Sequence, residues 1–275
     1  MSKYEDYHAT AANYDQTRTP AGLEILLGCF AANPRPLSEQ TVLDAGCGTG
    51  TCIRMLSDKI GCLHGLELNK NMLRRAQENL QGIRNVHLRH GKLPELPYEA
   101  ESFDGLMCNQ VLHHLGSGRS NSAFPELTRL LQEAFRVLRP NGVIVLNTSS
   151  RKQLRDGFWW ADLIPRAVDR IAVRFPPITE IEASFRAAGF HSAGRLVPLH
   201  EVLQGQGYLD PQGPLKKSYR DGDSTWSLAE QEELDAALER VRTMNAQGTM
   251  AAYLEQREAL RRNIGQATFV FARKA

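Results

Sequence analysis

The stretch Val42-Leu43-Asp44-Ala45-Gly46-Cys47-Gly48-Thr49-Gly50 decides the fold class of this chain. Its apolar start is typical of a buried strand, and its glycines let the backbone turn tightly directly afterwards. A helix is predicted next, over residues 50–59. Sheets built from such strand-turn-helix units bind ligands beyond the carboxyl ends of their strands. The turn is therefore the first candidate binding site.

Strands and helices alternate on both sides of this turn. With the first strand at residues 41–44, further strands are predicted at 61–68, 86–88, 102–108, 143–146 (after a turn at 140–142), 193–203 and 267–272. Further helices are predicted within 1–20, at 21–32, from the cap Asn69 to Leu80, at 127–138, 151–176 and 178–189, and from a capping box at Ser227 to about residue 263, with a loop at 204–224. This alternation predicts an α/β fold, Rossmann-like, with a seven-stranded, mostly parallel sheet.

The composition narrows the class of protein further. The chain has 275 residues, a formal net charge of +2 and a mean hydropathy of −0.38. It has no stretch of roughly 20 apolar residues and no apolar signal region at its start, so we expect a cytoplasmic protein without stable membrane insertion. Its five cysteines form no C-x-x-C pair, and the near-neutral charge argues against nucleic-acid binding. No spacing of histidine, cysteine or carboxylate residues indicates a metal site.

Glu67 narrows the choice of ligand for the glycine-rich turn. It ends the second predicted strand, 21 residues after Gly46, where a carboxylate can accept both hydroxyls of a ribose. A solvated strand end is the alternative. A dinucleotide-binding loop has the spacing G-x-G-x-x-G, but Thr51 stands at the third glycine position here and the spacing is G-x-G-x-G. An adenosine cofactor other than a dinucleotide is therefore favoured.

Four motifs in order resemble those of class I S-adenosylmethionine-dependent methyltransferases. They are VLDAGCGTG at 42–50, GLELNKNML at 65–73, SFDGLMCNQVLHHL at 102–115 and EAFRVLRPNGVIVL at 133–146. Within that class the chain is most similar to the small-molecule group that includes the ubiquinone and menaquinone C-methyltransferases. Residues 14–18, YDQTR, resemble an N-terminal element of the same group. The resemblance covers residues 41–150 and stops before the helical segments at 151–264.

The resemblance implies roles for individual residues in cofactor binding. The methionine amine and the ribose side would be held by Asp44 and by the loop containing Gly46, Cys47, Gly48 and Gly50. Glu67 would bind the ribose hydroxyls, and Leu68 would pack against the adenine. The methionine end would be contacted by Asn109, Tyr14 and Arg18. The family commonly has an aspartate that accepts a hydrogen bond from the adenine amine. Lys92 stands at that position and cannot accept it, so adenine would rely on backbone groups of Lys92 and Leu93.

Candidates for catalysis and substrate contact lie further along the chain. His113 follows the fourth predicted strand and is the candidate general base, the alternative being a local helix opening. Tyr7, His114, Phe158, Trp159 and Trp160 are the candidates for a substrate lid, although aromatic residues there would also pack a lid interior. Methyl transfer from a sulfonium needs mainly placement of the acceptor, so a base is required only where the acceptor keeps its proton.

These observations lead to one domain and one favoured function. We expect an N-terminal helical cap at 1–40, a cofactor-binding core at 41–150, a lid helix with the sixth strand at 151–203, a helical insertion at 204–264 and the last strand at 265–275. The expected activity is methyl transfer from S-adenosylmethionine to oxygen, nitrogen, sulfur or activated carbon of a small molecule in an enclosed site. An RNA or protein methyltransferase and a NAD-dependent dehydrogenase are the alternatives, and the chain is compatible with a homodimer.

Overall fold

The predicted sheet of seven strands is confirmed. The computed structural model describes residues 20–115 and 124–275. The strands are β1 Thr41–Ala45, β2 Cys62–Glu67, β3 Val86–His90, β4 Phe103–Asn109, β5 Leu138–Thr148, β6 Phe190–Leu196 and β7 Thr268–Lys274. They lie in the order β3-β2-β1-β4-β5-β7-β6, and β7 alone runs antiparallel to both neighbours. This is the α/β architecture with a mostly parallel sheet that the sequence predicts.

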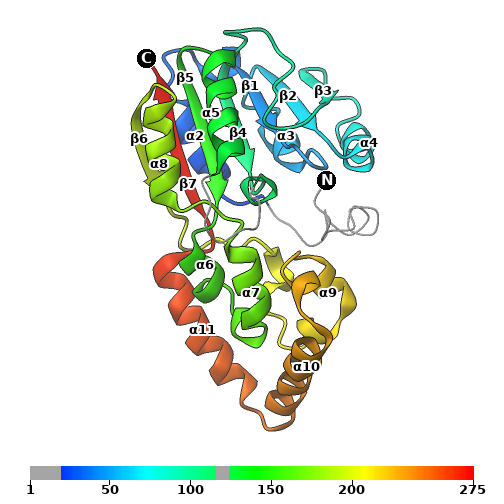
Figure 1. Cartoon of the computed structure of the whole chain (residues 1–275). Helices are drawn as coiled ribbons and strands as arrows, with labels where there is room; N and C mark the ends of the chain where they lie inside the picture. Colours follow the sequence, from blue (N-terminus) through cyan, green and yellow to red (C-terminus); the bar gives the residue numbers. More distant parts are fainter. Residues whose placement is uncertain (1–19, 116–123) are drawn as a thin grey trace.

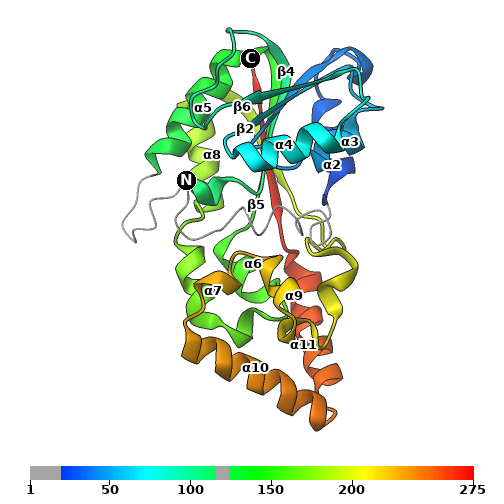
Figure 2. The ribbon, with the colours of Figure 1, turned by 90° about the vertical axis from the view of Figure 1, so that its right-hand side faces the viewer.

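Helices cover both faces of the sheet (Figure 2). One face carries α2 Leu23–Phe30, α3 Thr51–Leu56 and α4 Lys70–Asn79, and the other carries α5 Pro125–Val137 and α8 Ile178–Ala187. Alternate strand residues supply the two cores. Val42 packs with Leu26 and Ile53 on the first face, whereas Leu43 packs with the α5 residue Leu130 on the second. The side-chain alternation of β1 thus fixes which helices lie on which side.

A second group of helices lies at the carboxyl ends of the parallel strands (Figure 1). It contains α6 Arg151–Asp156, α7 Pro165–Ala172, α9 Lys217–Asp221, α10 Gln231–Ala246 and α11 Met250–Ile264, together with short 3-10 turns. We call these segments, residues 149–177 and 197–267, the helical part. Its own apolar core includes Trp159, Trp160, Tyr208 and Trp226. Among the described residues no helix is both long and apolar enough to span a membrane.

The single helix predicted at 151–176 is wrong, because the chain forms two helices there. The first, α6, ends at Gly157, where a Cβ would lie 2.6 Å from the carbonyl oxygens of Gln153 and Gly265. Pro165 then occupies the first turn of α7, where the missing amide hydrogen costs nothing. The bend between the two helices turns the aromatic residues at 158–160 into the helical part.

The helix predicted from Ser227 to residue 263 is also divided. The capping box at Ser227 is wrong: its hydroxyl donates to the carbonyl oxygen of Ser224, and α10 begins only at Gln231. Gly248, with φ of +70°, separates α10 from α11. The predicted loop at 204–224 contains the short helix α9 and two 3-10 turns at Gly205–Leu209 and Gly213–Leu215. Local helical turns therefore replace much of the expected loop.

The fifth and sixth strands have boundaries that differ from the prediction by more than two residues. The fifth strand begins at Leu138 rather than residue 143, so the predicted turn at 140–142 is an irregularity within the strand, where Asn141 has φ of +67°. The sixth strand covers Phe190–Leu196 rather than 193–203. Pro198 follows shortly after Leu196 and cannot donate a sheet hydrogen bond.

Buried side-chain amides fasten α6 to the segment that leads from α11 into β7. The side chain of Gln153 on α6 donates to the carbonyl oxygens of Ile264 and Ala267 at 2.9 and 3.0 Å. Gln266 donates to the carbonyl oxygen of Gly157 at 3.0 Å and accepts from the amide of Leu203 at 2.7 Å. These contacts hold the start of α6 against the α11–β7 junction.

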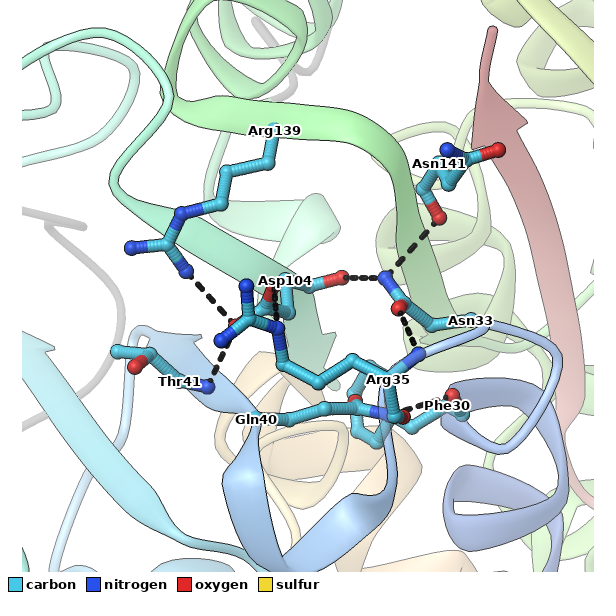
Figure 3. A network of polar contacts seen from close by, with 8 residues as sticks. All are labelled: Phe30, Asn33, Arg35, Gln40, Thr41, Asp104, Arg139 and Asn141. Carbon is cyan, nitrogen blue, oxygen red and sulfur yellow. Dashed lines mark hydrogen bonds and ion pairs between the residues drawn. The ribbon is translucent and has the colours of Figure 1, made fainter.

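The opposite end of the sheet is closed by a polar network around Asp104 (Figure 3). Its buried carboxylate accepts from the amide of Thr41 at 2.8 Å and forms ion pairs with Arg139 at 2.7 Å and Arg35 at 3.3 Å. The side chain of Asn33 donates to the carbonyl oxygens of Asp104 and Asn141. The network fastens the segment after α2 to the amino ends of β1 and β4, far from the glycine-rich turn.

Candidate active site

The three glycines of the turn after β1 have different reasons to be glycine. All have positive φ angles: +88° at Gly46, +56° at Gly48 and +79° at Gly50. A Cβ at Gly46 would lie 2.7 Å from Val111, and one at Gly50 would lie 2.6 Å from Leu80. At Gly48 no atom lies within 4 Å of such a Cβ. Packing therefore requires Gly46 and Gly50, whereas Gly48 presents bare backbone to open space.

Two carboxylates face this turn from the ends of neighbouring strands. Glu67 accepts hydrogen bonds from the amide of Gly48 at 3.0 Å and the amide of Asn69 at 2.7 Å. Asp44 is only 1% exposed, and the side-chain amide of Asn109 donates to it at 3.5 Å. The turn is thus held between β1, β2 and the end of β4.

The electrostatics of the two carboxylates favour a cation. Burial raises the pKa of Asp44 to about 7; the hydrogen bond from Asn109 acts in the opposite direction, and the charge of Glu67 raises the pKa further. Burial likewise raises the pKa of Glu67, against the effect of its backbone hydrogen bonds. A positively charged group bound beside Asp44 would offset both the loss of hydration and the repulsion.

The residues after β2 and β3 frame the far side of the turn. Leu68, the residue that follows Glu67 in the chain, has 44% of its surface exposed. Leu93 is half-buried against the core of the sheet. The amine of Lys92 forms an exposed ion pair with Glu95 at 2.9 Å, so its side chain is directed to that carboxylate. The exposed side chain of Leu68 is therefore an apolar surface at the end of β2.

A pocket opens where the sheet meets the helical part. It is lined by the segment after β4, by α6 and α7, and by the 3-10 region before α10. Its lining residues are Gln110, His113, His114, Ser149, Leu154, Phe158, Trp160, Val168, Ile171, Phe175, Leu203, Asp223, Ser224 and Thr225. The lining combines aromatic and aliphatic walls with a few polar groups, which is typical of small-molecule sites.

The two histidines of the segment after β4 both reach this pocket. The ring of His113 is buried, stacks on Phe175 with centroids 4.9 Å apart and lies 4.0 Å from the ring of His114. His114 keeps solvent contact at the pocket wall. Even so, loss of hydration at its ring lowers the pKa of His114 to about 4, and the positive charge of Arg174 acts in the same direction. The ring of His114 is therefore neutral at pH 7.

Gln110 is a pocket residue that the sequence analysis missed. It has φ of +52°, which is uncommon for a residue with a side chain. Its backbone amide and its side-chain amide donate to the backbone and side-chain oxygens of Asn147 at 2.8 and 2.9 Å. Such strain is held in place by the surrounding structure and gathers at functional sites. No sequence pattern indicates it, and the same holds for Asp223, which reaches the pocket from a distant segment.

The aromatic residues at 158–160 divide between two environments. Phe158 and Trp160 line the pocket, with ring centroids 5.0 Å apart. Trp159 is fully buried inside the helical part instead, where its amide donates to the hydroxyl of Tyr208 and its indole donates to the carbonyl oxygen of Tyr208. Trp159 therefore lies outside the pocket lining, and its position is that of a packing residue. Three other candidates, Tyr7, Tyr14 and Arg18, lie outside the described residues.

The segment from Asn109 to His114 connects the turn with the pocket. Asn109 contacts Asp44, and Val111 packs against Gly46, so this segment borders the turn. Gln110, His113 and His114 border the pocket. A ligand on the turn and a second molecule in the pocket would therefore meet along this segment.

Comparison with known proteins shows which class of protein the chain resembles. Residues 43–146 match the model of a family described as a methyltransferase domain, so the chain carries such a domain over this stretch. A demethylmenaquinone methyltransferase of Oceanobacillus iheyensis is 35% identical over 120 residues, which are 42% of this chain and 47% of that protein. The chain spans about half the length of the curated relatives it matches. The resemblance to class I methyltransferases of the quinone-modifying group is thereby confirmed.

Solved structures extend the similarity of the fold to the helical part. A presumed methyltransferase from an antibiotic biosynthesis pathway of Anabaena variabilis has a TM-score of 0.73 at 22% identity, over 94% of this chain and 99% of that chain. Phosphoethanolamine N-methyltransferase 2 of Haemonchus contortus, solved with S-adenosylmethionine, has a TM-score of 0.61 at 16% identity, over all of this chain and 60% of that one. At these identities the likeness concerns the fold.

Proposed function

We propose that the protein transfers the methyl group of S-adenosylmethionine to a small molecule held in the pocket beneath the helical part. The observation that carries the proposal is the segment from Asn109 to His114, which borders both the glycine-rich turn and the pocket. A lone pair of the acceptor attacks the methyl carbon, the carbon–sulfur bond breaks, and its electron pair stays on sulfur as S-adenosylhomocysteine forms. The matched methyltransferase domain, which contains the turn, supports this chemistry.

The residues around the turn fit this cofactor. Asp44 would pair with the methionine amine, which supplies the positive charge that its buried carboxylate lacks. Glu67 would exchange its bond to Gly48 for the ribose hydroxyls, and Leu68 would pack on the adenine. Bare backbone at Gly48 leaves room for the cofactor to approach closely. Backbone groups of Lys92 and Leu93 would contact the edge of the adenine.

The pocket favours a small acceptor with an apolar or aromatic body. Phe158, Trp160 and Phe175 supply ring surfaces, while Gln110 and Asp223 supply polar contacts that orient the acceptor. His113 would accept the proton of an acceptor that is protonated before attack. Most of the rate enhancement would come from holding the acceptor in line with the breaking bond.

A dehydrogenase or a macromolecular methyltransferase fits the site less well. Thr51 replaces the glycine that a dinucleotide loop has at that spacing, and an RNA or protein acceptor calls for an open groove rather than a pocket between two layers. We place the protein in the cytoplasm because all five cysteines are free. A homodimer is compatible with this proposal and is tested by the mass of the protein in solution.

Transfer of label from methyl-labelled S-adenosylmethionine into a size-fractionated cell extract tests the proposal. We expect label in the small-molecule fraction with the wild-type protein and at least tenfold less with Glu67→Ala. Label in the RNA or protein fraction would replace the acceptor class. Equal labelling by wild-type protein and Glu67→Ala would refute the assigned cofactor site.

A further inference from the structure

Three side chains with metal-binding atoms meet on strands β2 and β3, away from the glycine-rich turn. Cys62 and His64 lie two residues apart on β2, so their side chains leave the same face of the sheet. His87 on β3 is the register partner of His64. Cys62 is the first residue of β2 and Glu67 is the last, so the cluster lies towards the opposite end of the strand from the proposed cofactor site.

The spacing of the cluster suits a single ion. The sulfur of Cys62 and one ring nitrogen from each histidine all lie within 4.8 Å of one another, and the two imidazole rings are 5.0 Å apart. Zinc bonds of about 2.0–2.1 Å to nitrogen and about 2.3 Å to sulfur place tetrahedral ligand atoms roughly 3.5 Å apart. Side-chain rotations that move the ligand atoms by about 1 Å would bring them from up to 4.8 Å apart to this spacing. Rotations on this scale need no movement of the two strands.

The surroundings of the cluster prepare it for a metal ion. The ring of His64 is fixed by edge-to-face contacts with Tyr98 and Phe103, at 5.9 and 5.3 Å. His87 is exposed, which gives an ion a path from solvent. The cation nearest along the strand, Arg89, is turned away: it donates to the carbonyl oxygen of Pro97 and lies over the Tyr98 ring.

The pKa shifts of His64 and Cys62 act in opposite directions on metal binding. Burial lowers the pKa of His64, as does the neighbouring His87, which favours the neutral imidazole that binds metal. Burial raises the pKa of Cys62, so its thiol keeps its proton until an ion displaces it. Binding would therefore release one proton to solvent.

We propose that Cys62, His64 and His87 bind one divalent transition-metal ion of the zinc type, with water as the fourth ligand. One thiolate and two imidazoles are ligands that Zn²⁺ and Cu²⁺ prefer to the oxygen ligands of Mg²⁺ or Ca²⁺. The ion would join edge strand β3 to β2 and would take no part in methyl transfer. A search for ligand spacing in the sequence does not find this set, because His87 follows His64 by 23 residues and only strand pairing brings them together.

Zinc binding by tag-free, chelator-treated protein tests the site. Equilibrium dialysis with Zn²⁺ is expected to give one ion per chain with a dissociation constant of about 1 μM or below. Cys62→Ser and His87→Ala are each expected to weaken binding at least tenfold. The matched control is His191→Ala, which removes an exposed histidine from edge strand β6 and should bind as the wild type does.

Co²⁺ supplies a second readout, since a cobalt–thiolate bond absorbs strongly in the near ultraviolet. We expect this band in wild-type protein and in His191→Ala but not in Cys62→Ser. Because His87 is exposed, His87→Ala should fold normally. This variant therefore tests metal binding even if Cys62→Ser fails to fold. Absence of zinc binding at this affinity, or unchanged binding by His87→Ala, would overturn the proposal. Neither result depends on methyltransferase activity.

Discussion

At the residue scale, the buried carboxylate of Asp44 links the stability of the fold to the proposed cofactor binding. Its folded-state pKa of about 7 lies above the usual value of 3.8, so its contribution to stability is present below pH 4 and is lost as the pH rises through 7. Asp44 in its charged form is therefore costly in the ligand-free protein. A cation bound beside Asp44 is expected to stabilise this buried charge.

Asp44→Asn should raise the free energy of unfolding of the ligand-free protein at pH 8 by at least about 1.4 kcal/mol, the equivalent of one pKa unit. The gain should shrink as the pH falls towards 4, because the wild-type carboxyl is then protonated in the folded state. Urea unfolding at pH 8 and at pH 5 measures the difference in unfolding free energy between Asp44→Asn and the wild type at each pH. Destabilisation by Asp44→Asn at pH 8 would contradict this account of the site.

The same carboxyl predicts how cofactor binding depends on pH. Between pH 5.5 and 7 an α-amino group stays protonated, while Asp44 gains its charge as the pH rises. The affinity for S-adenosylmethionine should therefore rise over this range, by at most about tenfold per pH unit for one proton. Titration calorimetry at several pH values measures the slope. A slope that persists unchanged in Asp44→Asn would assign the effect to another group.

Gly48 and Gly50 form a matched pair for testing the turn. Gly48→Ala should lower stability by about 1 kcal/mol, from its positive φ alone. It should also weaken cofactor binding at least tenfold, because the new methyl group projects into the open space that the cofactor is proposed to occupy. Gly50→Ala should cost about 1–3 kcal/mol more in stability, since its Cβ meets Leu80 in the core. Thermal unfolding and calorimetry separate the two effects. Normal cofactor affinity in Gly48→Ala would place the ligand elsewhere.

At the element scale, the strands were predictable because buried apolar runs between turn signals need only local sequence. The helices of the helical part were not, because their breaks depend on contacts between distant segments. Gly157, for example, ends α6 against the carbonyl oxygen of Gly265. Ser227 carries the pattern of a capping box, yet the 3-10 turn at Trp226–Leu228 takes its place and α10 starts later. In the helical part, tertiary packing rather than the local sequence pattern determines where the helices begin and end.

Adjacent aromatic residues after α6 test the division between pocket and interior. Phe158→Leu should leave the fold intact and raise the KM for the acceptor roughly tenfold, the effect of a lost apolar contact in a pocket. Trp159→Ala should cost about 3–5 kcal/mol of stability, because the indole is fully buried. Steady-state kinetics and urea unfolding measure the two. An unchanged KM in Phe158→Leu would show that the acceptor binds outside this pocket.

At the scale of the whole molecule, the arrangement explains which parts of the candidate site the sequence could bring together and which it could not. Asp44, the glycines and Glu67 all lie at the ends of the first two strands, where motif order in the sequence mirrors position in space. The pocket instead combines residues 110–114 with residues as distant as Asp223, and these meet only because the helical part folds over the sheet. Sequence alone therefore identifies the cofactor class better than the acceptor.

Cofactor binding is the central claim, and calorimetric titration of the purified protein with S-adenosylmethionine tests it most directly. We predict one site per chain with an affinity in the micromolar range, lost in Glu67→Ala, and no binding of NAD under the same conditions. Binding of NAD in place of S-adenosylmethionine, or undiminished S-adenosylmethionine binding by Glu67→Ala, would contradict the assignment of this site.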